Sequence, residues 1–187
     1  MSNDIPIPLL GKSGAVFSRI LLKNKKEAAG LQIQKGNILY SVMNTFQMPL
    51  QLSAQMKSLH LAIKAVGFNS RTQYKNDLKC LFKSNEIIFP ILDDYKGRVF
   101  TAINTMPNNS LKFVVCGLIA QSYFEYVFTV SNTKFSSKFN AQIDGKSIEV
   151  FYIWHPSPSS GENGISAWEL KKILPLSKSL KNFHESN

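Results

Sequence analysis

The chain has few of the residues from which metal sites and disulfide frameworks are built. Its 187 residues include two cysteines, Cys80 and Cys116, which lie far apart in apolar patterns where we expect buried thiols. This number excludes a zinc site made of four cysteines. Three histidines are scattered, with His60 in a helical pattern, His155 in a loop and His184 in a polar tail. We therefore expect no metal, no cofactor and a reducing, cytoplasmic setting, or a nuclear one in a eukaryotic cell.

Long apolar runs and acidic residues are also scarce. No uncharged apolar run reaches the roughly 18 residues that a membrane-spanning helix needs, and the N-terminus lacks the pattern of a signal peptide. Only 12 acidic residues oppose 22 basic ones, which gives a formal net charge of +10. Such a positive field attracts polyanions, so DNA is the expected partner, with an acidic protein as an alternative. We expect a monomer that has no membrane partner.

With 44% hydrophobic and 18% charged residues, the chain has the composition of one folded domain. Apolar spacing divides it into a basic leader over residues 1–35, a domain over 36–178 and a tail over 179–187. Strands are predicted over residues 37–43, 87–89, 99–103, 111–115 and 148–154.

Helices are predicted between these strands, over residues 52–66, 70–82, 118–127 and 166–174. Ser70 is the expected N-cap of the second helix, and Gly67 the stop signal of the first. Residues 131–140 are polar and predict either a loop or pairing at a sheet edge. The alternation of strands and helices predicts an α/β fold, as a three-layer α/β/α sandwich with a mostly parallel central sheet.

Polar side chains follow three of the predicted strands, at Asn44, Asn104 and His155. In parallel α/β folds ligands bind outside the carboxyl ends of the strands, so one cleft could gather these residues. Each also has a purely structural interpretation, because asparagine is common in turns after strands and histidine often caps a turn. Phe46, two residues after Asn44, could be a stacking platform, although a phenylalanine is more often part of the core.

The loop after His155 alternates proline and serine. Pro156 and Pro158 hold the backbone extended, which presents the hydroxyls of the neighbouring serines to a phosphate at little ordering cost. The serines concerned are Ser157, Ser159 and Ser160.

The segment Trp-His-Pro-Ser-Pro-Ser at 154–159 resembles the second signature motif of the uracil-DNA glycosylase superfamily. Three upstream segments are similar to other family motifs in the same order: Ile-Leu-Tyr-Ser-Val-Met-Asn at 38–44, Asn-Thr-Met-Pro at 104–107 and Val-Val-Cys-Gly-Leu-Ile-Ala-Gln at 114–121. In style they are closest to the single-strand-selective monofunctional uracil glycosylases.

The resemblance implies a DNA glycosylase that hydrolyses the N-glycosidic bond of a flipped-out uracil or modified pyrimidine, in base excision repair or in defence against modified foreign DNA. Asn44 would position the attacking water, and His155 would stabilise the negative charge on the departing base. Asn104 would bind the pyrimidine edge and Phe46 would stack on its face. The serines at 157, 159 and 160 would bind DNA phosphates.

The chain also departs from the family pattern. Thr45 stands where a proline usually follows the asparagine of the first motif, and no acidic water-activating residue accompanies it. Only residues 105–110 separate Asn104 from the next predicted strand, where the family has a helix. A catalytically inactive DNA-binding module of the same fold therefore remains the alternative. An active enzyme would be monofunctional, because no lysine in the matched motifs is placed to form a Schiff base.

Overall fold

The computed structural model of the chain describes residues 54–105, 112–130, 138–153 and 155. The chain divides into two compact units, Thr45–Ile153 and a second unit made of Met1–Asn44 and Trp154–Asn187. In the second unit His155 is the one described residue. The predicted leader, the strand at 37–43, the helix at 166–174 and the tail lie outside the described residues.

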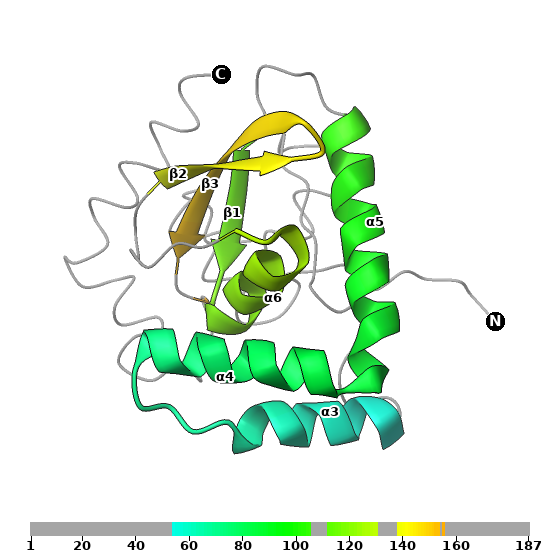
Figure 1. Cartoon of the computed structure of the whole chain (residues 1–187), viewed down its shortest axis with the longest axis vertical. Coiled ribbons are helices and arrows are strands. Elements are labelled where there is room, and N and C mark those ends of the chain that lie inside the picture. Colours follow the sequence, from blue (N-terminus) through cyan, green and yellow to red (C-terminus); the bar gives the residue numbers. More distant parts are fainter. Residues whose placement is uncertain (1–53, 106–111, 131–137, 154, 156–187) are drawn as a thin grey trace, which may run out of the picture. The chain divides into compact units, whose positions relative to one another are not determined.

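The unit Thr45–Ile153 begins, in its described part, with a hairpin of two helices (Figure 1), α3 (Ala54–Ala65) and α4 (Arg71–Ser84). Helix α3 buries Met56, Leu59 and Ile63, which recur at helical spacing. Helix α4 begins after Ser70, whose Oγ accepts a hydrogen bond from the backbone N–H of Gln73 at 3.2 Å. Both predicted helices and the predicted N-cap are confirmed.

The next segment is helical, so the two strands predicted over 87–89 and 99–103 were wrong. A 3-10 turn, η1 (Glu86–Ile88), leads directly into α5 (Phe89–Thr105). Its composition suggests strands, because β-branched and aromatic residues are frequent there. The spacing of the buried residues is nevertheless that of one helix face, since Leu92, Tyr95, Val99 and Ile103 follow one another at intervals of three or four.

The described sheet has three strands in the order β1-β3-β2. Strand β1 (Lys112–Cys116) runs parallel to β3 (Lys146–Ile153), and β2 (Lys138–Ile143) pairs antiparallel with β3. The strands predicted over 111–115 and 148–154 are thus confirmed to within two residues, and residues 138–140 pair at a sheet edge. This part of the sheet is mixed, and the three-layer sandwich with a mostly parallel sheet stays a prediction.

Helix α6 (Leu118–Phe128) confirms the helix predicted over 118–127 and contacts both β1 and α4 (Figure 1). Its aromatic residues face in two directions. The ring of Tyr123 packs on Phe82 of α4, with 4.3 Å between centroids, whereas Phe124 meets Tyr152 of β3 at 6.5 Å. These buried rings form a core between the hairpin and the sheet.

The two cysteines differ in environment. Cys80 is exposed, so its predicted burial was wrong: α4 buries the face of Leu78 and Phe82, and Cys80 lies on the opposite side. Cys116 is half-buried at the end of β1, and desolvation raises the pKa of its thiol to about 12.

Among the helices that the structure describes, none combines the length and apolar character that crossing a bilayer requires.

Candidate functional site

The candidate site lies at the edge of the sheet where β1 and β3 both end (Figure 1). Parallel pairing aligns the last residues of the two strands, Cys116 with Ile153. Gly117 follows β1 with a φ of 86°, a conformation that favours glycine, and starts α6 at this edge. His155 follows Ile153 by two residues, so covalent geometry keeps it within about 7 Å of the strand end.

His155 is exposed, which leaves its imidazole accessible to a ligand. Partial desolvation lowers the pKa of the imidazole below its usual value of 6.5. The neutral form therefore predominates at about pH 7. A neutral imidazole carries one N–H donor and one acceptor nitrogen, so it can donate a hydrogen bond to an oxygen on which negative charge develops.

Asn104 lies at the other end of β3. It belongs to the last turn of α5, and Nζ of Lys146 donates to its Oδ1 at 3.4 Å and to the carbonyl of Ile103 at 3.1 Å. Lys146 is the first residue of β3, and the seven residues on to Ile153 span about 23 Å. The predicted position of Asn104 at a strand's carboxyl end was wrong, and the structure does not bring it to the edge where β3 ends.

The remaining predicted site residues lie outside the described residues, and their roles stay predictions. They are Asn44, Phe46, Ser157, Ser159 and Ser160.

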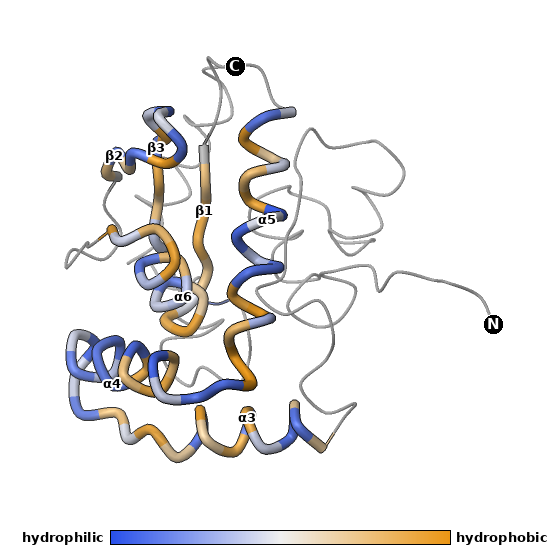
Figure 2. The backbone as a smooth tube through the Cα atoms, turned by 45° about the vertical axis from the view of Figure 1, so that its right-hand side comes forward, coloured by the Kyte–Doolittle hydropathy of each residue, from blue (hydrophilic) through white to orange (hydrophobic). Residues whose placement is uncertain are grey.

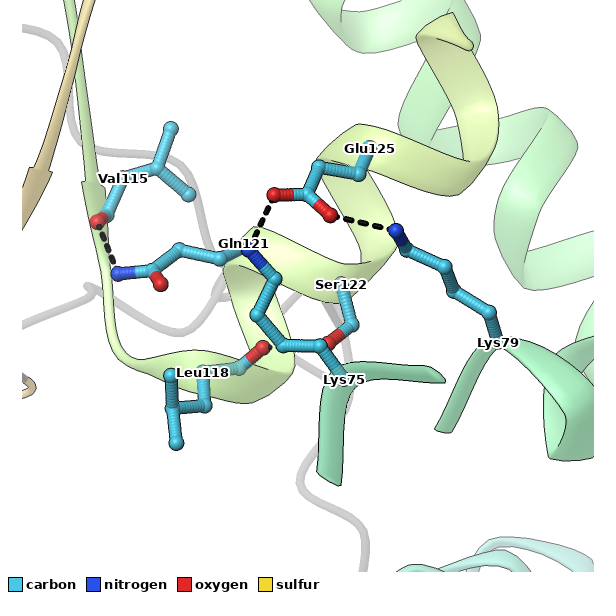
Figure 3. A network of polar contacts seen from close by, with 7 residues as sticks. All are labelled: Lys75, Lys79, Val115, Leu118, Gln121, Ser122 and Glu125. Atoms are coloured by element: carbon cyan, nitrogen blue, oxygen red, sulfur yellow. Dashed lines mark hydrogen bonds and ion pairs between the residues drawn. The ribbon is translucent and has the colours of Figure 1, made fainter. Parts of the chain in front are cut away.

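A second polar cluster, which the sequence analysis missed, lies buried between α4 and α6 (Figure 3). The Glu125 carboxylate of α6 binds two ammonium groups of α4, with Lys75 on Oε1 and Lys79 on Oε2 at 2.5 Å. The side chain of Glu125 is 1% exposed, that of Lys75 8% and that of Lys79 25%. The signal was present in the sequence, because Glu125 is the single charged residue of α6, whose residues are mostly apolar.

Burial and mutual attraction oppose each other in this cluster. Desolvation lowers the pKa of Lys75, while its contact with Glu125 acts in the opposite direction. The Lys75 ammonium lies 5.2 Å from the centroid of the Tyr152 ring. Desolvation and the nearby Glu125 carboxylate both raise the pKa of the Tyr152 phenol, which therefore stays neutral. The cluster thus joins α4, α6 and β3 by charge as well as by packing.

Of two further polar side chains of α6, one bonds to β1 and the other bonds within the helix (Figure 3). Gln121 donates from Nε2 to the carbonyl of Val115 at 3.3 Å, and Ser122 donates from Oγ to the carbonyl of Leu118 at 2.7 Å. Both residues are buried. The bond of Gln121 to Val115 spans Gly117 and helps to fix this turn, which borders the edge where β1 and β3 end.

A separate open cleft of about 380 Å³ is formed by the start of α5 and the end of α6, and none of its residues belongs to the predicted site. It is lined by Phe89, Leu92, Asp93, Lys96, Tyr126 and Val127.

Comparisons with known proteins identified no relative of this chain. No protein-family model, no curated protein and no solved structure matches the chain, so its functional interpretation depends on its own residues and their geometry.

Proposed function

We propose that the chain is a monofunctional DNA glycosylase that releases uracil or a modified pyrimidine from DNA. One observation supports this most directly: an exposed His155 follows the last residue of β3 by two positions in the sequence, and β3 ends level with the parallel strand β1. Ligands of parallel α/β sheets bind at such edges. The segment that begins there also has the His-Pro-Ser-Pro pattern of the uracil-DNA glycosylase superfamily.

In the proposed reaction, the bond between C1′ of the sugar and the base nitrogen breaks, and its electron pair leaves with the base. The neutral imidazole of His155 donates a hydrogen bond to a base oxygen and stabilises the charge that develops there. Asn44 positions the water whose oxygen replaces the base at C1′, and the proton that this water loses passes through solvent to the released base anion. The serines at 157, 159 and 160 bind the phosphates beside the flipped nucleotide.

Asn104 is not part of the proposed site, because Lys146 holds it at the opposite end of β3. This finding favours a second candidate function, a catalytically inactive DNA-binding module. The Thr45 departure in the first motif favours it as well. In such a module the basic charge retains its role in binding DNA, whereas no base is released.

The test is base release from DNA that contains uracil, damaged bases or hypermodified pyrimidines. We expect abasic sites, detected by alkaline cleavage, together with a free base identified by mass spectrometry. Replacing His155 with Asn should slow release by about 100- to 1,000-fold, because the shorter asparagine amide does not reach the oxygen that the imidazole N–H would bind, while DNA binding persists. His60→Asn, a half-buried histidine of α3, is the matched control and should retain wild-type rates.

Retained activity in both His155→Asn and Asn44→Ala would reject these site residues. Binding of DNA without base release from any substrate would reject the enzyme and favour the inactive module. The pH profile gives an independent check: because the pKa of His155 is below 6.5, its protonation should change the rate with a midpoint below that pH. A break in the profile above about pH 7 that vanishes in His155→Asn would contradict the neutral imidazole.

A further inference from the structure

The excess positive charge of the described residues is concentrated in the helical hairpin, which we define as residues 54–84. This segment contains six basic residues and one acidic residue, whereas the other described residues contain five basic and six acidic ones. The basic residues of the hairpin are Lys57, Lys64, Arg71, Lys75, Lys79 and Lys83. The hairpin is therefore the part of the described structure with a strong attraction for polyanions.

Several of these charges are available to a partner. Lys75 and Lys79 bind Glu125, but Lys57, Lys64 and Lys83 are exposed and form no ion pair with any other residue in the described ranges. Helix α4 is hydrophilic along most of its length (Figure 2). Polyanion binding would thus use cations that pair with no acidic residue in the described part of the chain.

An exposed aromatic side chain lies in the loop of the same hairpin. Phe68 is 60% exposed, and its ring lies 5.7 Å from that of the half-buried Tyr74, tilted by 58°. Lys64 precedes it by four residues and Arg71 follows it by three. Aromatic rings flanked by cations are the usual elements of surfaces that bind single-stranded nucleic acids, since rings stack on bases and cations contact phosphates.

We propose that the hairpin is a binding surface for single-stranded nucleic acid, on which Phe68 stacks against a base and the exposed lysines contact phosphates. This deepens the proposed function and rests on it for the assumption that the polynucleotide is DNA. No residue of the hairpin is among those to which we assign base release, so binding and chemistry can be tested with different variants.

The same residues fit a membrane surface less well. An interfacial helix needs a continuous apolar stripe. On α3 the one large exposed apolar residue is Leu61, and it shares its face with Lys57 and Lys64, four residues before it and three after. The adjoining loop places Asn69 and Ser70 directly after Phe68. Isolated apolar side chains among lysines suit a nucleic-acid strand better than a lipid bilayer.

The first arm of the test measures stacking with the full-length chain, by fluorescence anisotropy of a labelled thymidine oligonucleotide and of a duplex. We expect Phe68→Ala to weaken single-strand binding about tenfold, and to leave duplex binding unchanged, because stacking needs an unpaired base. Phe68→Trp keeps a flat ring and should retain wild-type affinity. Phe89→Ala is the matched control, since Phe89 is 44% exposed at the start of α5, and should not alter binding.

The second arm measures charge through the salt dependence of binding. Replacing Lys57, Lys64 and Lys83 with Gln should reduce the slope of log affinity against log salt by about 2. Lys64→Gln alone should reduce it by about 0.7, whereas Lys96→Gln on α5 should leave it unchanged. Circular dichroism and thermal unfolding would verify that every variant is folded.

Unchanged single-strand affinity in Phe68→Ala and in the triple lysine variant would overturn the inference. Phe68-dependent binding to phosphatidylserine vesicles that exceeds binding to the oligonucleotide would also overturn it, in favour of a membrane. Hairpin-dependent binding without any base release would support this inference and reject the proposed enzyme. Base release by a protein whose hairpin variants bind DNA normally would support the proposed enzyme and reject this inference.

Discussion

The buried Glu125 carboxylate shows how far a single charge depends on its neighbours. Removing a carboxylate from water is costly, and in this fold two ammonium groups of α4 compensate for that cost. The loss of one partner from such a cluster leaves an uncompensated buried charge, whereas replacement of the whole pair by apolar residues of similar volume is often tolerated. The changes in stability that follow loss of one partner and replacement of the whole pair differ enough to be distinguished by measurement.

We predict that Glu125→Ala lowers the free energy of unfolding by about 3–5 kcal/mol, because the buried Lys75 loses the carboxylate that offsets its desolvation. The double variant Glu125→Leu with Lys75→Met should recover most of this loss. Urea denaturation followed by circular dichroism measures both. Asp94→Ala, which breaks the exposed ion pair of Asp94 with Arg98, is the control and should cost no more than about 0.5 kcal/mol. If Glu125→Ala and Asp94→Ala lowered the free energy of unfolding equally, this account would be contradicted.

At the scale of elements, two glycines show that the effect of adding a side chain depends on backbone conformation even where the available space does not differ. Asp144 and Gly145 join β2 to β3 with φ values of 52° and 72°, the pair of positive angles typical of a tight two-residue hairpin. Gly97 lies instead within α5, on its exposed side. A Cβ at either position would meet no atom within 4 Å, so crowding distinguishes neither.

We predict opposite effects for the same substitution at these two glycines. Gly145→Ala should lower the free energy of unfolding by about 1 kcal/mol, because alanine is strained at positive φ. Gly97→Ala should raise it by about 0.5–1 kcal/mol, because alanine loses less backbone freedom in a helix. Thermal and urea denaturation of the two variants provide the comparison. Stabilisation by Gly145→Ala would show that the turn is not held as described.

Helix α5 also shows where local composition misleads. Residues 87–89 and 99–103 have the β-branched and aromatic composition of strands, and each is too short to show a helical period by itself. The helix is evident only when Val99 and Ile103 are aligned with Leu92 and Tyr95 on one face, which packs into the core. Burial of that face outweighs the local preference of its residues.

At the scale of the whole molecule, charge and exposed apolar surface both disfavour self-association. The chain carries a formal net charge of +10, so copies repel one another at low salt. Within the part of the chain that the structure describes, the large exposed apolar side chains are Leu61, Phe68 and Phe89. A stable interface between copies needs a larger continuous apolar area than three such residues provide.

We therefore predict that the chain sediments as one species with the mass of a single copy, 21.0 kDa. Sedimentation velocity at several protein concentrations and at low and moderate salt tests this. A concentration-dependent dimer would contradict it. If Leu61→Gln abolished that dimer, the exposed face of α3 would be the interface between copies.

The amino-acid pattern alone identified α3, α4 with its Ser70 cap, α6 and the strands around 112–116 and 146–153, because in each the apolar period agrees with the local preference. It also identified His155 as a polar residue just beyond a strand. The position of Asn104 could not be predicted, since it depends on α5 being one helix whose end bonds to Lys146 across a distance of 42 residues in sequence. The pairing of Glu125 with Lys75, 50 residues apart, likewise exists only after α4 packs on α6. Periodicity records which face of an element is buried, whereas long-range packing determines which buried faces meet.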